Sequence, residues 1–119
     1  MASALGPLEA LRWGSPTRRE SVSPTFAADA TVRKILNNNP NRVSWVLVNK
    51  GAVDAHVDVT PQVSASQGFT LAANGGFLSF LYEEDGEAAF EEVYVVAPGG
   101  ATTIFRQGVE VRQARKVPP

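Results

Sequence analysis

The chain has 119 residues, a formal net charge of −1 at pH 7 and no cysteine. Its length fits a single domain, and the near-neutral charge gives no basic field that would attract nucleic acid. The lack of cysteine excludes disulfides, thiolate metal sites and thiol nucleophiles. No apolar run approaches the roughly twenty residues of a membrane-spanning helix, and the N-terminus lacks the charged-then-apolar order of a signal peptide. We therefore expect no membrane partner, no nucleic-acid partner and synthesis in the cytoplasm.

Proline interrupts the first 28 residues at short intervals, at Pro7, Pro16 and Pro24. Because proline lacks an amide donor and disfavours helix in the residue before it, we expect residues 1–28 to form an extended N-terminal arm. Such an arm is either a disordered tail or a segment that buries its large residues on a neighbouring subunit, and we favour the second. The candidate partner-binding residues of the arm are Arg12, Trp13, Arg18, Arg19 and Phe26.

A central strand is predicted at residues 42–49, where Val43, Trp45 and Leu47 share one face and two further valines lie on the other. A strand that is apolar on both faces belongs in the middle of a sheet or between two layers. Its β-branched and aromatic residues favour a strand over a helix. We expect Trp45 to lie in the core.

Other short strands are separated by turn signals such as Asn74-Gly75 and Pro98-Gly99. The sequence thus predicts about seven short strands, with a turn roughly every 8 to 12 residues and no helix of ordinary length, as in an all-β antiparallel sandwich or small barrel. We expect this domain to span residues 29–112, followed by a C-terminal tail at 113–119. The predicted strands besides the central one are 31–36, 52–60, 69–71, 77–82, 92–97 and 101–111.

Asp54, His56 and Asp58 alternate along one predicted strand and share one face. A carboxylate-histidine-carboxylate row could hold a cation. However, same-face residues are spaced along a line and converge poorly on one ion, and there is no second histidine. We favour a solvated strand face and expect no metal and no cofactor.

The sequence contains no recognisable catalytic pattern. Neither Gly75-Gly76 nor Gly99-Gly100 is followed by a helix or by the lysine of a phosphate-binding loop. A Ser-His-Asp arrangement would have to use His56, and no Gly-x-Ser-x-Gly elbow is present. We therefore expect that the protein is not an enzyme, and we name no catalytic residue.

Six acidic residues fall within the ten residues from Glu83 to Glu92. They form either a solvated hairpin or a docking patch for a basic neighbour. Residues 99–105 carry no charge and would make a poor solvated sheet edge, and opposite charges on one chain suit a ring of identical copies. We therefore expect a homotrimer. The candidate inter-subunit charge patch comprises Glu83, Glu84, Asp85, Glu87, Arg112 and Arg115.

The run Asn39-Pro40-Asn41-Arg42 leads into the apolar strand that ends at Asn49. This run resembles a pattern of small virion proteins of tailed bacteriophages, in which an N-P-x-R turn precedes an apolar strand ending in Asn. Later segments of this sequence follow in the same order as in those phage proteins. The resemblance covers approximately residues 35–111 and leaves the arm outside. The resemblance implies a β-sandwich that sits on a phage particle, often in several copies, and it transfers no catalytic residue. The later segments that carry the resemblance are residues 71–76, 93–97 and 99–104.

The resemblance leads us to expect a capsid decoration or cement protein on the outer head surface of the virion. Its partners would be the major capsid protein and other copies of itself. The arm would cross a subunit boundary and add contacts that must break before the shell bursts. Two alternatives stay open: a phage neck, tail or head-fibre component, and a carbohydrate-binding module, which would need exposed aromatic residues on one sheet face.

Overall fold

The structure, a computed structural model, describes residues 17–81 and 91–111. These residues form nine β-strands and contain no helix. The strands are β1 (Thr17–Arg19), β2 (Thr25–Ala28), β3 (Arg33–Leu36), β4 (Arg42–Asn49), β5 (Ala55–Asp58), β6 (Phe69–Leu71), β7 (Phe77–Leu81), β8 (Val93–Val96) and β9 (Thr102–Val111).

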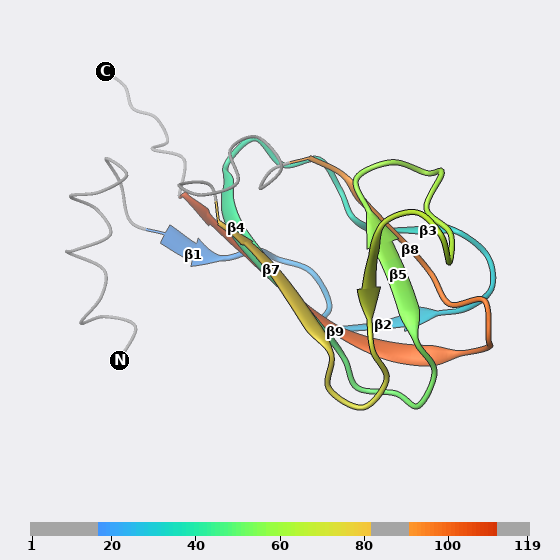
Figure 1. Cartoon of the computed structure of the whole chain (residues 1–119). Coiled ribbons are helices and arrows are strands. Elements are labelled where there is room, and N and C mark those ends of the chain that lie inside the picture. The colour runs from blue at the N-terminus through green and yellow to red at the C-terminus, as the bar shows by residue number, and fades with distance from the viewer. Residues whose placement is uncertain (1–16, 82–90, 112–119) are drawn as a thin grey trace, which may run out of the picture.

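The strands form two antiparallel sheets that pack face to face (Figure 1). In the first, called sheet A, the order is β1-β9-β4-β7, with β2 also paired to β9. In the second, called sheet B, the order is β3-β8-β5-β6. When β1 and β2 are taken as one broken strand, each sheet has four strands, and their order is that of a jelly roll. The predicted all-β sandwich is confirmed, with nine described strands in place of about seven.

Residues 17–28 differ from the prediction, which placed them in an arm outside the sandwich. β1 and β2 lie along one edge of β9, with Arg18 opposite Glu110 and Phe26 opposite Ile104. Over residues 21–23 the chain leaves β9, and it returns at Pro24, whose carbonyl accepts from the Arg106 amide at 2.8 Å. An edge strand tolerates proline because no second strand needs its missing amide hydrogen. Pro24 thus lies at a sheet edge, and the sandwich includes residues that we had assigned to the arm.

β9 is a central strand of sheet A, since β4 pairs with one side of it and β1 and β2 pair with the other. The prediction that residues 99–105 form a sheet edge available for association is therefore wrong. The argument that this edge drives trimer formation no longer holds. The edges of sheet A are instead the broken strand β1–β2 and strand β7.

The core lies between the two sheets, and β4 contributes Trp45 and Leu47 to it, at 2% and 0% exposure. The ring of Trp45 stacks on that of Phe80, with centroids 4.6 Å apart. From sheet B, Val57 and Val95 are fully buried against them. Each such aliphatic side chain contributes about 1.5–3 kcal/mol by leaving water. Trp45 is thus a core residue, as its sequence context predicted.

Candidate functional site

The outer face of sheet A carries apolar side chains away from the core. Val48 lies between Phe77 and Phe105 across the sheet, and Val46 lies between Ser79 and Gln107. Phe77 is 70% exposed, whereas both valines and Phe105 are half-buried. Successive residues of a strand point to opposite faces, so these residues face away from the buried side chains of Trp45 and Leu47.

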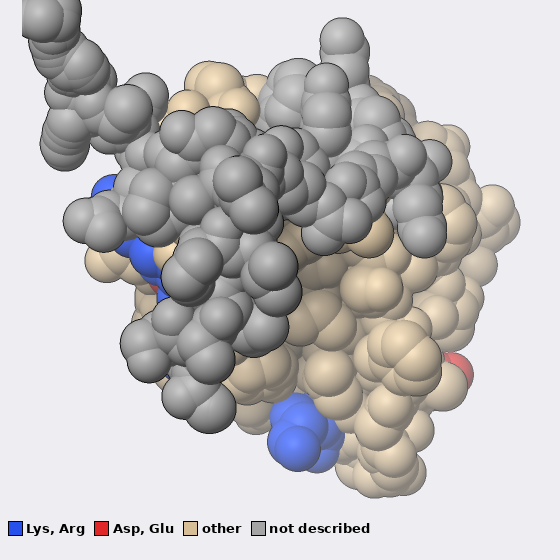
Figure 2. All heavy atoms as spheres, turned by 90° about the vertical axis from the view of Figure 1, so that its left-hand side faces the viewer, with Lys and Arg blue, Asp and Glu red and all other residues tan. Residues whose placement is uncertain are grey.

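Charge is nearly absent from this outer face. Arg19 is the only charged residue at the outward positions of sheet A among the residues described. Near β7 the face is hollowed by a shallow depression lined in part by Val46, Leu81 and Val109. On the side of the molecule shown in Figure 2, the described surface is also mainly uncharged, with only small areas of charged side chains. The outer face of sheet A thus combines half-buried apolar side chains with one large exposed apolar side chain, that of Phe77.

The outer face of sheet B is polar. Lys34, Tyr94 and Asp58 lie side by side across β3, β8 and β5. The Tyr94 hydroxyl donates to Glu92 Oε1 at 2.5 Å, and Lys34 Nζ lies 3.1 Å from Glu92 Oε2. These bonds, that of Tyr94 first, lower the pKa of Glu92, and they raise the pKa of Lys34 and of Tyr94. The two sheets therefore present unlike surfaces: that of sheet A carries Arg19 as its single described charge, and that of sheet B carries several charged groups.

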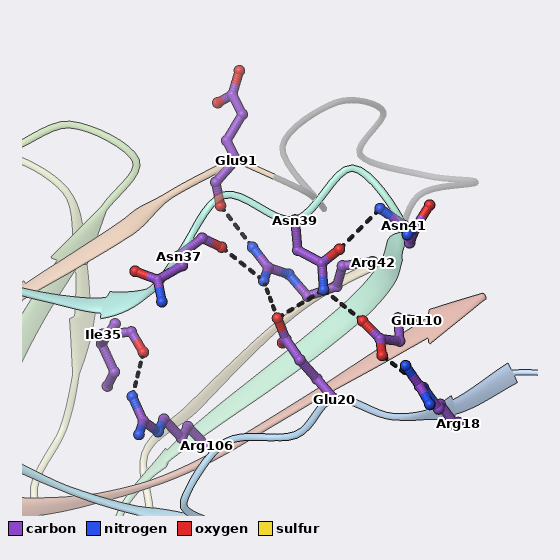
Figure 3. A network of polar contacts seen from close by, with 10 residues as sticks. All are labelled: Arg18, Glu20, Ile35, Asn37, Asn39, Asn41, Arg42, Glu91, Arg106 and Glu110. Atoms are coloured by element: carbon purple, nitrogen blue, oxygen red, sulfur yellow. Dashed lines mark hydrogen bonds and ion pairs between the residues drawn. The ribbon is translucent and has the colours of Figure 1, made fainter. Parts of the chain in front are cut away.

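A polar cluster replaces apolar packing at one end of the sandwich (Figure 3). Its centre is Arg42, whose side chain is 0% exposed and lies 2.9 Å from the Glu20 carboxylate. Arg42 also donates to the backbone carbonyls of Asn37 at 2.9 Å and Glu91 at 2.8 Å. Burial lowers the pKa of Arg42, and the charge of Glu20 opposes this shift. A buried cation of this kind persists only because its hydrogen bonds are satisfied.

The same cluster holds the broken edge strand onto β9. The Asn39 side-chain amide donates to Glu20 at 2.9 Å and to Glu110 at 2.7 Å. Glu110 in turn accepts from Arg18 Nε of β1 at 2.8 Å. Arg18 lies in β1 and Glu20 follows β1 directly. The edge strand is therefore bonded to β9 through Glu110 and to the loop before β4 through Asn39. The cluster thus fixes the place where the chain of residues 1–16 joins the sandwich.

The structure gives most of the described arm residues contacts within the chain. Arg18 forms the ion pair with Glu110, and Arg19 lies exposed on the outer face of sheet A. Phe26 packs against the core, and the guanidinium of Arg106 lies 5.0 Å from its ring centroid. Phe26 is therefore an internal packing residue and offers little surface to a partner.

The remaining predicted site residues lie outside the described part of the chain. They are Arg12 and Trp13 of the arm, and Glu83, Glu84, Asp85, Glu87, Arg112 and Arg115 of the charge patch.

The row of Asp54, His56 and Asp58 does not converge on one point. Asp54 accepts the amide hydrogen of Ala73 at 2.8 Å, and Asp58 accepts that of Val59 at 2.7 Å. His56 Nδ1 lies 3.1 Å from the Thr70 hydroxyl. Within residues 17–81 and 91–111, no group of three or more His, Cys, Asp or Glu side chains could hold a metal ion, and no helix is long and apolar enough to cross a membrane.

Comparison with known proteins gives one structural likeness. No protein-family model and no curated protein matches the chain. A solved structure described by the words "Bacillus endospore appendages form a novel family of disulfide-linked pili" is similar, with a TM-score of 0.48 and 16% identity, over 80% of this chain and 87% of that chain.

Proposed function

We propose that the protein is a virion structural protein of a tailed bacteriophage, a capsid decoration or cement protein that binds the outer surface of the head. The observation that carries this proposal is the contrast between the two sheets. The outer face of sheet A is uncharged apart from Arg19, and Phe77 on it is 70% exposed. The outer face of sheet B carries Lys34, Asp58 and Tyr94. A subunit that coats a shell needs one face for the shell and one for water.

The fold and the resemblance to phage virion proteins support this function. Jelly rolls occur in viral capsid proteins, and also in lectins and cupins, so the fold alone does not decide between them. Apolar contact across subunit boundaries stabilises a shell by mass action, since bound subunits must leave before the shell opens.

The structure changes the expected role of the arm. Residues 17–28 belong to the sandwich, so the segment that could reach over the shell is residues 1–16. The polar cluster around Arg42 and Glu20 holds β1 on the sandwich, and residues 1–16 precede β1 in the chain. Arg12 and Trp13 stay the candidate contact residues of the arm, because aromatic and arginine side chains dominate interface energies.

Binding to particles that lack the protein tests the proposal. Val46→Lys places a charge at the centre of the outer face of sheet A, and Thr70→Lys places the same charge on sheet B, where Thr70 is exposed. We expect Val46→Lys to weaken co-sedimentation with particles by about tenfold or more, which is about 1.4 kcal/mol, and Thr70→Lys to have little effect. Equal binding by both variants and the unchanged chain would contradict the proposal.

Copy number separates the positions within a virion. A decoration protein is present at a number comparable to that of the shell subunit, whereas a neck or tail component is present at the small number set by the tail symmetry. Quantitative mass spectrometry of intact particles, with the major capsid protein as the reference, measures this ratio. A low ratio would favour the neck or tail alternative.

One observation favours a second candidate, a carbohydrate-binding module. Phe77 and Phe105 lie in one row of the outer face, on either side of Val48, and sugars stack on exposed aromatic rings. Tyr82, the aromatic residue that follows β7 in the sequence, lies outside the described residues. A glycan array probed with the full chain decides this: binding that Phe105→Ala abolishes would support it, and no hits would exclude it.

A further inference from the structure

The turn between β6 and β7 contains the only Asn-Gly pair of the sequence, Asn74-Gly75. Asn74 has a φ of 64°, in the left-handed region that asparagine adopts more readily than most residues. Both residues are exposed, and the Asn74 side-chain amide has no hydrogen-bond partner among the residues described. Backbone held in a rare conformation is often found at reactive or functional positions.

An Asn-Gly pair carries the reactants for a modification of its own side chain. The Gly75 nitrogen attacks Cγ of Asn74, and the bond from Cγ to Nδ2 breaks, so that a cyclic succinimide forms. The side-chain amino group leaves as ammonia, and it takes up the proton that the Gly75 amide has lost. Water then opens the ring at either carbonyl and leaves aspartate or isoaspartate at position 74. Glycine favours the attack because it has no side chain to obstruct the ring.

The fold keeps the attacking nitrogen from this reaction. Gly75 N donates to the backbone carbonyl of Asn49 at 2.7 Å, and Asn74 N donates to that of Gly51 at 2.8 Å. These bonds hold the turn between β6 and β7 against the turn between β4 and β5 (Figure 1). Asn49 is fully buried. An amide hydrogen that is bonded in this way is released to solvent only when the structure opens locally.

One further hydrogen bond holds the same turn from its exposed side. The Asp54 carboxylate accepts the amide hydrogen of Ala73, the residue before Asn74, at 2.8 Å. Asp54 is exposed and lies outside the hydrophobic core. A substitution at Asp54 therefore removes a bond that closes the turn while the side chains of the core stay in place.

We propose that Asn74 is a deamidation site of this chain, and that the turn of residues 72–76 is the gate that controls its reaction. While the turn is closed the Gly75 amide is bonded to Asn49, so only molecules in which the turn has opened react. Isoaspartate lengthens the main chain, and either product adds a negative charge, so the closed turn does not re-form as before. A transient opening thus becomes a permanent change. This inference goes beyond the proposed function, because it concerns the chemistry of the chain itself and does not depend on a particle.

Peptide mapping by mass spectrometry measures the reaction in the full chain, incubated at mildly alkaline pH with and without urea. Pro98→Asn is the matched variant, because it places a second Asn-Gly pair before Gly99, which is exposed and whose amide donates to no described residue. We expect Asn74 to deamidate in urea and to react at least about tenfold more slowly in the native chain. The asparagine introduced at position 98 should react at similar rates in both. Equal rates for Asn74 in both conditions, no reaction in urea, or equal protection of both sites would overturn the proposal.

Substitution of Asp54 tests the gate. Asp54→Ala removes the bond to Ala73, and it should raise the rate at which native Asn74 deamidates by roughly two- to tenfold, the range by which one hydrogen bond shifts an equilibrium. Asp54→Asn keeps an oxygen acceptor and removes the charge, so its rate should stay close to that of the unchanged chain. No acceleration in Asp54→Ala, or equal acceleration by both substitutions, would show that opening of this turn does not control the reaction and would overturn the proposal.

Discussion

The carboxylate of Glu20 occupies the space that a side chain at Gly108 would need. A Cβ built on Gly108 would overlap Glu20 Oε1 and would lie 2.9 Å from Cδ of Arg42. Gly108 pairs with Trp45 across sheet A, so its missing side chain leaves room inside the sandwich beside the tryptophan. Glu20 and Arg42 fill that room, and Glu20 Oε1 is buried there with no hydrogen-bond partner among the described residues.

Gly108→Ala should therefore destabilise the fold. The methyl group would displace Glu20 from Arg42, and overpacking of this kind costs about 1–3 kcal/mol. Gly99→Ala is the control, because a Cβ there would meet only a side-chain carbon of Val53, at 3.1 Å. Urea unfolding of both variants measures the difference. A Gly108→Ala protein as stable as the control would mean that the polar cluster can move without cost.

Arg42→Leu should be among the most damaging single substitutions in the domain. It leaves the Glu20 carboxylate buried without its cation, and breaking a buried ion pair costs about 3–5 kcal/mol. Replacing both Arg42 and Glu20 by leucine should cost less than the sum of the single changes, because neither charge is then left alone. The exposed pair of Arg33 and Asp29 offers the contrast, and Arg33→Leu should change the unfolding midpoint little. Additive effects of the two leucine changes would show that the pair is not coupled.

Trp45→Ala tests the core of the sandwich. Trp45 is 2% exposed and stacked on Phe80, and deleting a buried aromatic side chain costs about 3–5 kcal/mol. Val46→Ala, on the opposite face of the same strand, should cost less than about 1 kcal/mol, as surface changes usually do. Thermal unfolding monitored by circular dichroism compares them. Similar losses in the two variants would be inconsistent with the two faces assigned here to β4.

The contacts of Glu92 predict a pH dependence that Glu92→Gln should remove. The bonds from Tyr94 and Lys34 lower the pKa of Glu92 below its ordinary value of 4.5. The folded state therefore favours the carboxylate, and this stabilisation is present above the ordinary pKa and disappears as the pH falls through the lowered one. We expect the native chain to have the higher melting temperature at pH 7 and the difference to vanish in acid. A difference independent of pH would show that the charge of Glu92 is not involved.

The strands that could be predicted from sequence are those with buried faces. β4 and β8 are rich in apolar residues because both strands contribute side chains to the core. That burial produces the apolar pattern from which they can be predicted. β1 and β2 left no such trace, because an edge strand pairs through its backbone and most of its side chains are exposed. Tertiary pairing with β9, and not local preference, decides their conformation.

The polar cluster was missed for a different reason. Arg42 stands at the start of an apolar strand, where a charged residue is usually solvated, and its partners Glu20 and Glu110 are far away in the sequence. Only the register of β9 brings these three together. The signal that could have shown it is the glycine at position 108 in an otherwise continuous strand, because glycine in a strand often marks a close approach of other atoms.

Two deletions separate the sandwich from the arm. Removing residues 1–28 takes away β1 and β2, the core residue Ala28 and the Glu20 partner of Arg42. This should abolish folding or cost a large fraction of the roughly 5–15 kcal/mol by which domains are stable. An arm at residues 1–28 outside the sandwich, as the sequence predicted, would have been dispensable for folding, whereas the structure places β1 and β2 in sheet A. Removing residues 1–16 alone should leave the melting temperature unchanged, because β1 and the polar cluster stay intact.

The shorter deletion then tests the arm itself. If residues 1–16 contact the shell through Arg12 and Trp13, the truncated chain should fold normally and yet co-sediment with particles more weakly than the full chain. The double substitution Arg12→Ala and Trp13→Ala should reproduce most of that loss in a chain of full length. If the truncated chain binds particles as tightly as the full one, attachment rests on the outer face of sheet A alone. If removal of residues 1–28 leaves a cooperatively folded protein, the edge strand and its contact with Arg42 do not stabilise the sandwich as described.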